Sequence, residues 1–582
     1  MSKNRILAVV PLLALAACPP LGSTSQPLVS GSDAEKDLRS EIGWLSMGCT
    51  ATVVDPAIVL TAAYCLGYQN SVPADAFFAY TPRGGAKEVR VGVVRGYSLG
   101  AEGGEMDLAV VRLAREVVDR YQYQLRPARI EGGPPEEGDR VTLFGYGCID
   151  RNTGWGGGTK RYVEFEWGSS TSLCDGDLGG PVVYGEPQGQ GSIWGVSSGY
   201  ELPNGSDHFA LASHAIPLVN AVRRIGGTTY NDVPAANFAG WAKEPGARLV
   251  SGDFNGDGVD DLALTGAGGW GTIPVALKSR SGIGFRIENW AVADFPGWAA
   301  YPGVQVLSGD FDEDGWGDIA LVGGPHWTTI AVAYSKPPGI FIVRNVQLPE
   351  FADLADRWGS CPISTRCLPV TAVSGDFDGD GASDIALVGG DGTTIPIAFS
   401  RGFDRFEMKK ISAPEFTAFA RWPGARPVAG RFLTPNKTVA WSVDRLISSI
   451  ALIGGIGWGT IPLVVLSPTE NRFYELNPVV ADFPLWARSP GVKVAAGDFD
   501  GDGSDDLVLA GSPGWRTLAF AFSDGHGGFE PGNLPIDQVP GWAADPGVQM
   551  VTGDFTSDRW QDVAFAGAWG RRTVPIVWMR GR

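Results

Sequence analysis

The stretch CDGDLGGP, residues 174–181, places one apolar side chain, Leu178, in a turn built from glycines and aspartates. Glycine adopts backbone conformations that other residues avoid, so Gly176, Gly179 and Gly180 together predict a tight turn. Leu178 is the unexpected residue of this stretch. Its meaning depends on the rest of the chain.

The length and composition of the chain limit what it can be. A chain of 582 residues is too long for a single core and predicts about two to four domains. The 82 glycines, 41 prolines and 19% of charged residues favour short strands joined by tight turns, so we expect an all-β protein. The formal charge of −18 argues against nucleic acid as a partner, because phosphate binding needs a basic face.

The N-terminus has the pattern of an export signal. Lys3 and Arg5 precede an apolar run from residue 6 to residue 17, and the sequence LAAC at 15–18 resembles the lipobox of bacterial lipoproteins. That resemblance implies a signal peptide over residues 1–18, lipidation of Cys18 and a linker over 19–27. We therefore expect a lipoprotein of the bacterial cell envelope or surface, held at the membrane by its lipid. The alternative is an ordinary signal peptide and a secreted protein.

The cysteine count fits an exported protein. Of the seven cysteines, Cys18 is set aside as the lipidation site, and six remain, enough for three disulfides in fifteen possible pairings. The six are Cys49, Cys65, Cys148, Cys174, Cys361 and Cys367.

Residues 28–227 carry an ordered set of motifs. They are LVSGSDA at 28–34, CTATVVDPAIVLTAAYC at 49–65, DLAVVRL at 107–113, GDRVTLFGYG at 138–147, CDGDLGGPVV at 174–183 and IWGVSSG at 193–199, followed by an amphipathic stretch at 216–225. In this order they resemble a trypsin-like serine peptidase of the chymotrypsin fold. The resemblance implies a double β-barrel closed by a C-terminal helix.

Two of the three catalytic positions implied by this resemblance hold residues that cannot do the chemistry. The position of the general base holds Tyr64, and a phenol with a pKa of about 10 is a poor base at neutral pH. The position of the nucleophile holds Leu178, and a hydrocarbon cannot attack a carbonyl. Asp107 matches the acid of the triad but has no imidazole to orient. The domain is therefore expected to be a pseudoprotease.

Other features of the peptidase family carry over by position. The backbone N–H groups of Gly176 and Leu178 match an oxyanion hole, and Ser172 matches the floor of the specificity pocket. The resemblance implies a disulfide between Cys49 and Cys65, which leaves Cys148 and Cys174 to pair with each other. None of the four histidines stands at the position of the base.

The chain from residue 229 to residue 582 is internally repeated. Six glycine-anchored units such as VSGDFDGDGASDIAL recur, each followed by an echo such as TIPIAF, with anchoring glycines at 252, 309, 375, 430, 497 and 553. Four short strands per unit of this length fit the blade of a β-propeller. The last unit is one strand short, so we expect residues 229–238 to complete a sixth blade.

The repeated DFDGDGxxD pattern resembles the FG-GAP or VCBS repeats of integrin-like propellers, which implies Ca²⁺ as cofactor. Oxygens at positions 1, 3, 5 and 9 can surround one hard cation, and glycine at position 6 permits the sharp turn. Four sites are complete: Asp253, Asn255, Asp257 and Asp261; Asp310, Asp312, Asp314 and Asp318; Asp376, Asp378, Asp380 and Asp384; Asp498, Asp500, Asp502 and Asp506. The unit around Arg431 has lost its acids, and Thr556 and Arg559 interrupt the sixth unit.

The repeats also contain a pair of cysteines and a recurring tryptophan. Cys361 and Cys367 are close enough in sequence to close a small loop. Recurring tryptophans are expected either to pack within the blades or to line sugar pockets: Trp241, Trp298, Trp422, Trp486 and Trp542.

The sequence as a whole favours an exported binding protein with an extracellular protein, peptide or glycan as ligand. Two alternatives remain: a serine-type endopeptidase with an unrecognised nucleophile and a propeller that delivers substrate, and a lectin-like adhesin in which the protease fold is only a spacer.

Overall fold

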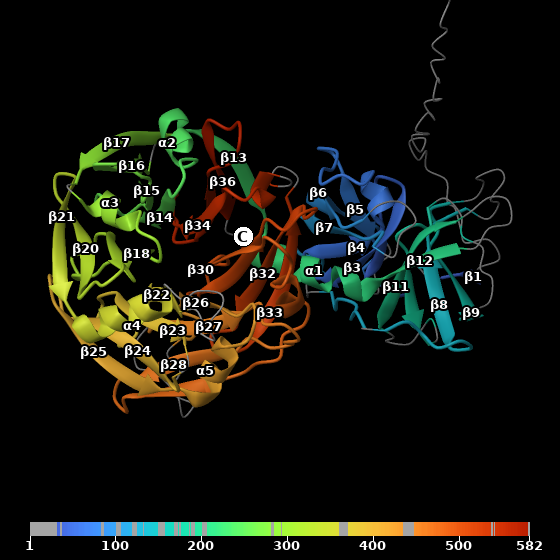
Figure 1. The fold of residues 1–582 in the computed structure, drawn as a ribbon. Helices are drawn as coiled ribbons and strands as arrows, with labels where there is room; N and C mark the ends of the chain where they lie inside the picture. The colour runs from blue at the N-terminus through green and yellow to red at the C-terminus, as the bar shows by residue number, and fades with distance from the viewer. Residues whose placement is uncertain are drawn as a thin grey trace, which may run out of the picture. The chain divides into compact units, whose positions relative to one another are not determined.

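The computed structural model describes residues 32–34, 38–82, 87–100, 106–118, 125–131, 133–148, 157–167, 173, 176–185, 187, 192–200, 207–280, 284–292, 294–359, 370–390, 392–434, 447–536, 539 and 542–579. The expected all-β class is confirmed, with 46% strand and 11% helix. The chain divides into two compact units, Met1–Val219 and Asn220–Arg582 (Figure 1). The signal peptide, the lipobox, the linker and residues Ser172, Cys174, Cys361 and Cys367 lie outside the described residues. No helix among the described residues is long and apolar enough to span a membrane.

The first unit contains a closed barrel and an open sheet. The barrel has the order β2-β3-β4-β7-β6-β5, with strands β2 (Ile42–Leu45), β3 (Cys49–Asp55), β4 (Ile58–Thr61), β5 (Phe77–Tyr80), β6 (Val89–Ser98) and β7 (Ala109–Leu113). The sheet has the order β1-β9-β8-β10-β11-β12, with strands β1 (Ser32–Asp33), β8 (Arg140–Gly145), β9 (Arg161–Glu166), β10 (Pro181–Tyr184), β11 (Ile193–Tyr200) and β12 (Asp207–Leu211). Of the two barrels expected, the described residues thus close one.

The elements of the first unit follow the sequence motifs. The CTATVVDPAIVLT segment forms the hairpin of β3 and β4, in which the strands are apolar and mostly buried. The AAYC segment that follows forms a short 3₁₀ helix, η1 (Ala63–Leu66). A second 3₁₀ helix, η2 (Ala212–Ala215), leads into α1 (Ile216–Ile225), which confirms the expected amphipathic helix.

In the described part of the second unit, the strands form six open, antiparallel, four-stranded sheets. The first three are β14 (Arg248–Gly252), β15 (Asp261–Thr265), β16 (Thr272–Lys278) and β17 (Phe285–Ala291); β18 (Gln305–Gly309), β19 (Asp318–Val322), β20 (Thr329–Lys336) and β21 (Ile340–Gln347); and β22 (Val370–Gly375), β23 (Asp384–Gly389), β24 (Thr394–Ser400) and β25 (Phe406–Ser412).

The last three sheets repeat this arrangement. They are β26 (Arg426–Gly430), β27 (Ser449–Ile453), β28 (Leu463–Ser467) and β29 (Arg472–Leu476); β30 (Lys493–Gly497), β31 (Asp506–Ala510), β32 (Thr517–Ser523) and β33 (Phe529–Pro535); and β13 (Thr228–Pro234), β36 (Thr573–Met579), β35 (Asp562–Ala566) and β34 (Gln549–Gly553). Short helices precede the first strands: α2 (Ala236–Trp241), α3 (Phe295–Ala299), α4 (Pro349–Gly359), α5 (Pro414–Ala420), α6 (Phe483–Trp486) and η3 (Trp542–Ala544).

The sixth sheet is completed from the other end of the repeat region. Strand β13 pairs with β36 in antiparallel register from Thr228 opposite Met579 to Pro234 opposite Thr573. The expected outer strand is therefore confirmed for residues 229–234, and the strand begins one residue earlier, at Thr228. The prediction is wrong for residues 236–238, because they begin helix α2.

The central strands are apolar on both sides because each sheet packs against two others. In β15, Ala263 packs with Ile319 and Leu321 of the second sheet, whereas Leu262 and Leu264 pack with residues of the sixth sheet. A strand covered on both faces reads as a continuous apolar run, and all of β15 (DLALT) is buried. The outer strand β17 (FRIENWA) instead mixes buried and exposed residues.

Candidate functional site

Backbone carbonyls of the turn around Leu178 accept hydrogen bonds from Thr50, in strand β3 of the barrel. The Thr50 N–H donates to the Leu178 carbonyl over 2.9 Å, and Thr50 Oγ1 donates to the Gly176 carbonyl over 2.7 Å. Gly179 has a φ of +82°, and a Cβ there would lie 2.0 Å from Thr61 Oγ1 and 2.2 Å from the Thr50 carbonyl oxygen. The fold itself therefore requires glycine at this position.

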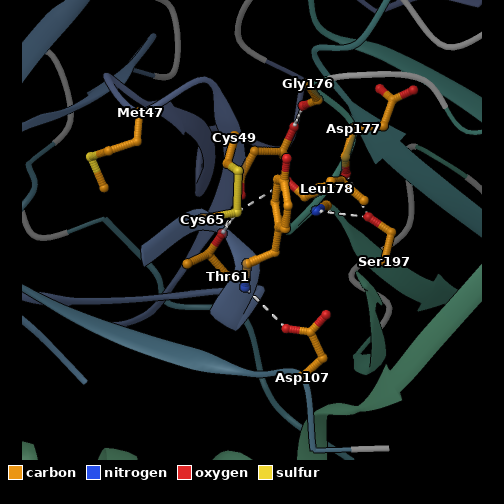
Figure 2. The surroundings of a disulfide bond; sticks show 12 residues. Met47, Cys49, Thr61, Cys65, Asp107, Gly176, Asp177, Leu178 and Ser197 are labelled. Atoms are coloured by element: carbon orange, nitrogen blue, oxygen red, sulfur yellow. Dashed lines mark hydrogen bonds between the residues drawn. A yellow bond between two sulfur atoms is a disulfide. The ribbon is translucent and has the colours of Figure 1, made fainter. Parts of the chain in front are cut away.

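The polar groups beside Leu178 hold the backbone in place. The Gly147 N–H donates to Asp177 Oδ1 over 2.6 Å, and Ser197 Oγ donates to the Asp177 carbonyl over 2.5 Å. The Gly180 N–H donates to Ser197 Oγ over 3.2 Å (Figure 2). Asp177 and Ser197 are fully buried, so Ser197 is a structural hydroxyl of this turn.

The structure brings two of the three triad-equivalent positions into direct contact. The backbone N–H of Tyr64, in η1, donates to Asp107 Oδ1 over 3.1 Å, and Asp107 is fully buried. The Tyr64 side chain is 45% exposed. A disulfide between Cys49 and Cys65 anchors η1, as the resemblance implied, and the Leu178 carbonyl lies 3.9 Å from Cys65 Sγ. Cys148 is also disulfide-bonded, and Cys174 lies outside the described residues.

This arrangement holds positions 64, 107 and 178 on a well-bonded backbone framework. The Leu178 side chain is 7% exposed and offers no nucleophile, whichever base stands beside it. His208 lies in β12 and His214 in η2, so neither belongs to the η1 segment that carries Tyr64.

The four acidic turns of the second unit connect the first and second strands of their sheets. In each, the first aspartate follows the anchoring glycine and the last one begins the second strand, as Asp310 and Asp318 do between β18 and β19. The first aspartate accepts the backbone N–H groups of its own turn; Gly315, for example, donates to Asp310 Oδ2 over 2.8 Å. The backbone of the turn thus curves around the carboxylate of its first aspartate.

Three of the four turns gather carboxylates closely enough to share one cation. In each group one oxygen per residue lies within 4.8 Å of the others: Asp310, Asp312 and Asp318; Asp376, Asp378 and Asp384; Asp498, Asp500 and Asp506. The first turn has Asn255 at the third position, where its Nδ2 donates to Asp261 Oδ2 over 3.0 Å. Oxygen ligands of this kind suit Ca²⁺.

Burial makes the ionised form of the carboxylates in these turns unfavourable. Desolvation raises the pKa of Asp261, Asp318 and Asp384 to about 8, and the neighbouring carboxylates push these pKa values in the same direction. The buried oxygens Asp312 Oδ1 and Asp378 Oδ1 accept no hydrogen bond. A bound cation would satisfy these oxygens and stabilise the ionised carboxylates, so the residues fit the metal.

A basic side chain contacts each of the three carboxylate clusters, and the sequence did not predict these contacts. In the second turn Lys336 Nζ lies 2.6 Å from Asp312 Oδ2, and in the third turn Arg401 lies 2.8 Å from Asp378 Oδ2. Both basic residues follow a serine at the end of the third strand, in SK and SR, and this recurrence was the available signal. The fourth acidic turn belongs to the fifth sheet and is called the fifth turn. There Arg224, from helix α1, is the basic side chain, and its Nη1 lies 2.5 Å from Asp500 Oδ2.

The recurring tryptophans are not equivalent. Trp241, Trp298 and Trp486 pack against core clusters, which agrees with the packing interpretation. Trp422 is 50% exposed and donates through Nε1 to the Ile456 carbonyl over 2.7 Å. Trp542 packs edge to face on Phe565, with ring centroids 5.3 Å apart.

Comparison with known proteins concerns the first unit. A family model described as Trypsin matches residues 29–219. Among solved structures, neuropsin, a serine protease expressed in the limbic system of mouse brain, is 14% identical with a TM-score of 0.28, covering 34% of this chain and 100% of that chain. Human heparin binding protein is 18% identical with a TM-score of 0.27, covering 32% of this chain and 93% of that chain. A search of curated proteins found no match.

The family match and the geometry agree over the same part of the chain. The matched segment contains the closed barrel, the disulfide-anchored η1 and the glycine turn around Leu178. Residues 29–219 are a trypsin-like serine protease domain.

Proposed function

We propose that this chain is a non-catalytic binding protein, in which a trypsin-like domain without hydrolytic chemistry is joined to a calcium-stabilised β-propeller. One observation carries the loss of catalysis: the buried turn that would present a nucleophile presents Leu178, and Tyr64 takes the position of the base. A protein that keeps the fold and lacks both groups is suited to binding rather than cutting.

Contacts between neighbouring sheets support the propeller. Each acidic turn or its counterpart is hydrogen-bonded to the turn of the preceding sheet, as when the Gly317 N–H donates to the Asp253 carbonyl over 2.7 Å. The series closes, because the Asp260 N–H of the first sheet donates to the Asp554 carbonyl of the sixth over 3.0 Å. The first strands also contact one another in the order β14, β18, β22, β26, β30, β34 and back to β14.

The fit of the acidic turns supports calcium. The donors are carboxylate oxygens at the spacing of a calcium loop, and two of the buried oxygens lack a hydrogen bond. Burial and neighbouring carboxylates raise the pKa of Asp318 and so disfavour its charged form. When bound, the cation supplies positive charge that offsets the mutual repulsion of the carboxylates. This role is structural, and it stabilises the sheets on which a ligand would bind.

A cavity in the second unit supports a binding role. It has a volume of about 490 Å³, lies beside the first acidic turn, and is lined by Trp290 and Trp316 together with Asn255, Asp257 and Glu288. Flat apolar rings beside amide and carboxylate groups suit a sugar or a peptide. With the export signal and the lipid on Cys18 proposed above, that ligand would be extracellular.

Two measurements test this function on the purified chain. A fluorophosphonate probe should leave the protein unlabelled, whereas labelling mapped to a serine of residues 29–219 would favour the endopeptidase alternative. Peptide and glycan arrays, run with calcium and with EDTA, should identify a ligand whose binding Trp316→Ala abolishes. Trp422→Ala is the matched control. Binding that survives Trp316→Ala would place the site elsewhere.

A further inference from the structure

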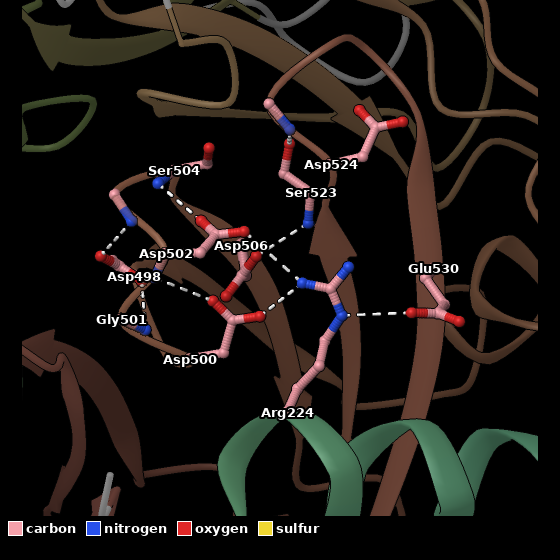
Figure 3. Close-up of polar contacts among 12 residues, drawn as sticks. Arg224, Asp498, Asp500, Gly501, Asp502, Ser504, Asp506, Ser523, Asp524 and Glu530 are labelled. Atoms are coloured by element: carbon pink, nitrogen blue, oxygen red, sulfur yellow. Dashed lines mark hydrogen bonds and ion pairs between the residues drawn. The ribbon is translucent and has the colours of Figure 1, made fainter. Parts of the chain in front are cut away.

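The basic residue at the fifth acidic turn comes from a different part of the chain than those at the second and third turns. Lys336 and Arg401 belong to the sheets whose aspartates they contact. The corresponding position of the fifth sheet, after Ser523, holds Asp524, which is acidic. The cation at this turn is Arg224, in the last turn of α1 (Figure 3).

Arg224 lies in the second unit, Asn220–Arg582, and is held by three carboxylates of that same unit. Its Nη1 lies 2.5 Å from Asp500 Oδ2 and 3.5 Å from Asp502 Oδ2, and its Nε lies 3.1 Å from Glu530 Oε2. The guanidinium also lies 5.4 Å from the centre of the Phe522 ring. The side chain of Asp500 is only 4% exposed, so its ion pair with Arg224 is largely shielded from water.

The remaining carboxylate oxygens of the turn accept backbone N–H groups from the turn and from the end of β32. Asp498 accepts from Gly501 and Gly503, and Asp506 accepts from Phe499 and Ser523. Asp500 Oδ1 accepts from the Asp502 N–H and Asp502 Oδ1 from the Ser504 N–H, over 3.2 and 2.8 Å. Asp500 Oδ2 and Asp502 Oδ2, the two oxygens that Arg224 reaches, are therefore the ones a cation would most readily take.

We propose that Arg224 and Ca²⁺ compete for Asp500 and Asp502, so that calcium binding at the fifth turn releases the end of helix α1. This inference rests on the calcium binding of the proposed function. Two positive charges cannot share the same pair of oxygens at close range without repulsion. At the second and third turns, calcium would displace only the side chain of Lys336 or Arg401, which belongs to the same sheet as the turn. At the fifth turn, it would displace Arg224 and so detach the end of helix α1.

The release is limited to the last turn of α1. Asn220 Nδ2 donates to the Pro531 carbonyl over 3.0 Å, and Arg223 pairs with Glu530 over 2.6 Å, and neither contact involves the acidic turn. Calcium should therefore loosen residues around Arg224 while these two contacts remain. Calcium binding at the fifth turn would then be detected in the last turn of helix α1, which lies far from that turn in the sequence.

Calcium titration of the full chain, followed by calorimetry, tests the competition. Arg224→Gln should bind calcium at one site about tenfold more tightly, the equivalent of about 1.4 kcal/mol. Arg223→Gln is the matched control, because Arg223 pairs with Glu530 and does not contact the turn, and its calcium affinities should equal those of the unmodified chain. Asp312→Asn and Asp378→Asn identify the second and third sites in the titration.

Hydrogen exchange of the peptide covering residues 216–225 gives the second readout. Saturating calcium should raise its exchange rate in the unmodified chain and leave it unchanged in Asp500→Asn. Equal calcium affinities in Arg224→Gln and the unmodified chain, or unchanged exchange at saturation, would overturn the competition even though calcium binds. Failure of calcium to bind at any turn would overturn both this inference and the calcium part of the proposed function.

Discussion

At the scale of single residues, the proposed loss of catalysis depends on two side chains, Tyr64 and Leu178. Asp107 is buried and receives the Tyr64 N–H, and the glycine turn keeps its bonds to Thr50. In the proposed function, Leu178 and Tyr64 replace the reactive groups without disturbing this framework. The proposed loss of catalysis is therefore a change of chemistry on a preserved backbone.

This view predicts what reverting the two residues would do. Leu178→Ser alone should remain unlabelled by a fluorophosphonate probe, because a serine without a general base is a weak nucleophile. The double variant Tyr64→His with Leu178→Ser should gain labelling at position 178, since Asp107 already lies beside the base position. Mass spectrometry of the labelled peptide measures this gain. An unlabelled double variant would show that more than these two side chains has been lost.

At the scale of elements, the acidic turns join sheet strands while burying carboxylates. Burial raises the pKa of Asp318 and Asp384 to about 8, from an ordinary value of 3.8. A group with a raised pKa in the folded state stabilises the fold fully at low pH, and this contribution is lost as the pH rises through that raised value.

The calcium-free protein should therefore melt at a lower temperature as the pH rises from about 5 to about 8, by several degrees. Saturating calcium should remove most of this fall, because the cation stabilises the ionised carboxylates. Calorimetry in EDTA and in calcium measures both profiles. Asp318→Asn removes one titrating group and should flatten the EDTA profile. A profile in EDTA that is flat over this range would contradict the effect of burial.

The pairing of β13 with β36 makes a second prediction for elements. Backbone amides of residues 229–234 should exchange with solvent as slowly as those of β17, the outer strand of the first sheet, because both are hydrogen-bonded along one edge. Hydrogen exchange with mass spectrometry compares the two peptides in one experiment. Exchange of residues 229–234 at the rate of a free linker would refute the pairing.

At the scale of the whole molecule, only the second unit carries the acidic turns, so calcium should affect the two units differently. A cation that binds the folded form alone stabilises it by about 2.7 kcal/mol per site at a hundredfold excess over the Kd. EDTA should lower the melting transition of the second unit and leave that of the first nearly unchanged. Calorimetry resolves the two transitions.

Variants of single turns sharpen the calcium measurement. Asp502→Ala should weaken the effect of EDTA by removing one site. Asp558→Ala is the matched control, since Thr556 and Arg559 interrupt the motif of the sixth sheet. Identical melting in EDTA and in millimolar calcium would mean that the acidic turns are not metal sites.

The sequence by itself determined the all-β class and the trypsin-like segment, and it predicts the missing base and nucleophile and the six repeats. Those features depend on residue identity at fixed spacing, as in TAAYC, CDGDLGGP and DGDGxxD. Even the pairing of residues 229–234 with the last strand followed from counting strands in the repeats.

Only the tertiary structure decided which groups meet across long stretches of chain. Arg224 reaches Asp500, 276 residues away, and the Asp260 N–H of the first sheet reaches the Asp554 carbonyl of the sixth. Sequence spacing carries no signal for such contacts, because the packing of whole sheets and helices sets them. The same packing fixes the burial that raises the pKa of the turn carboxylates, so the cost of their charge also became visible only in the folded chain.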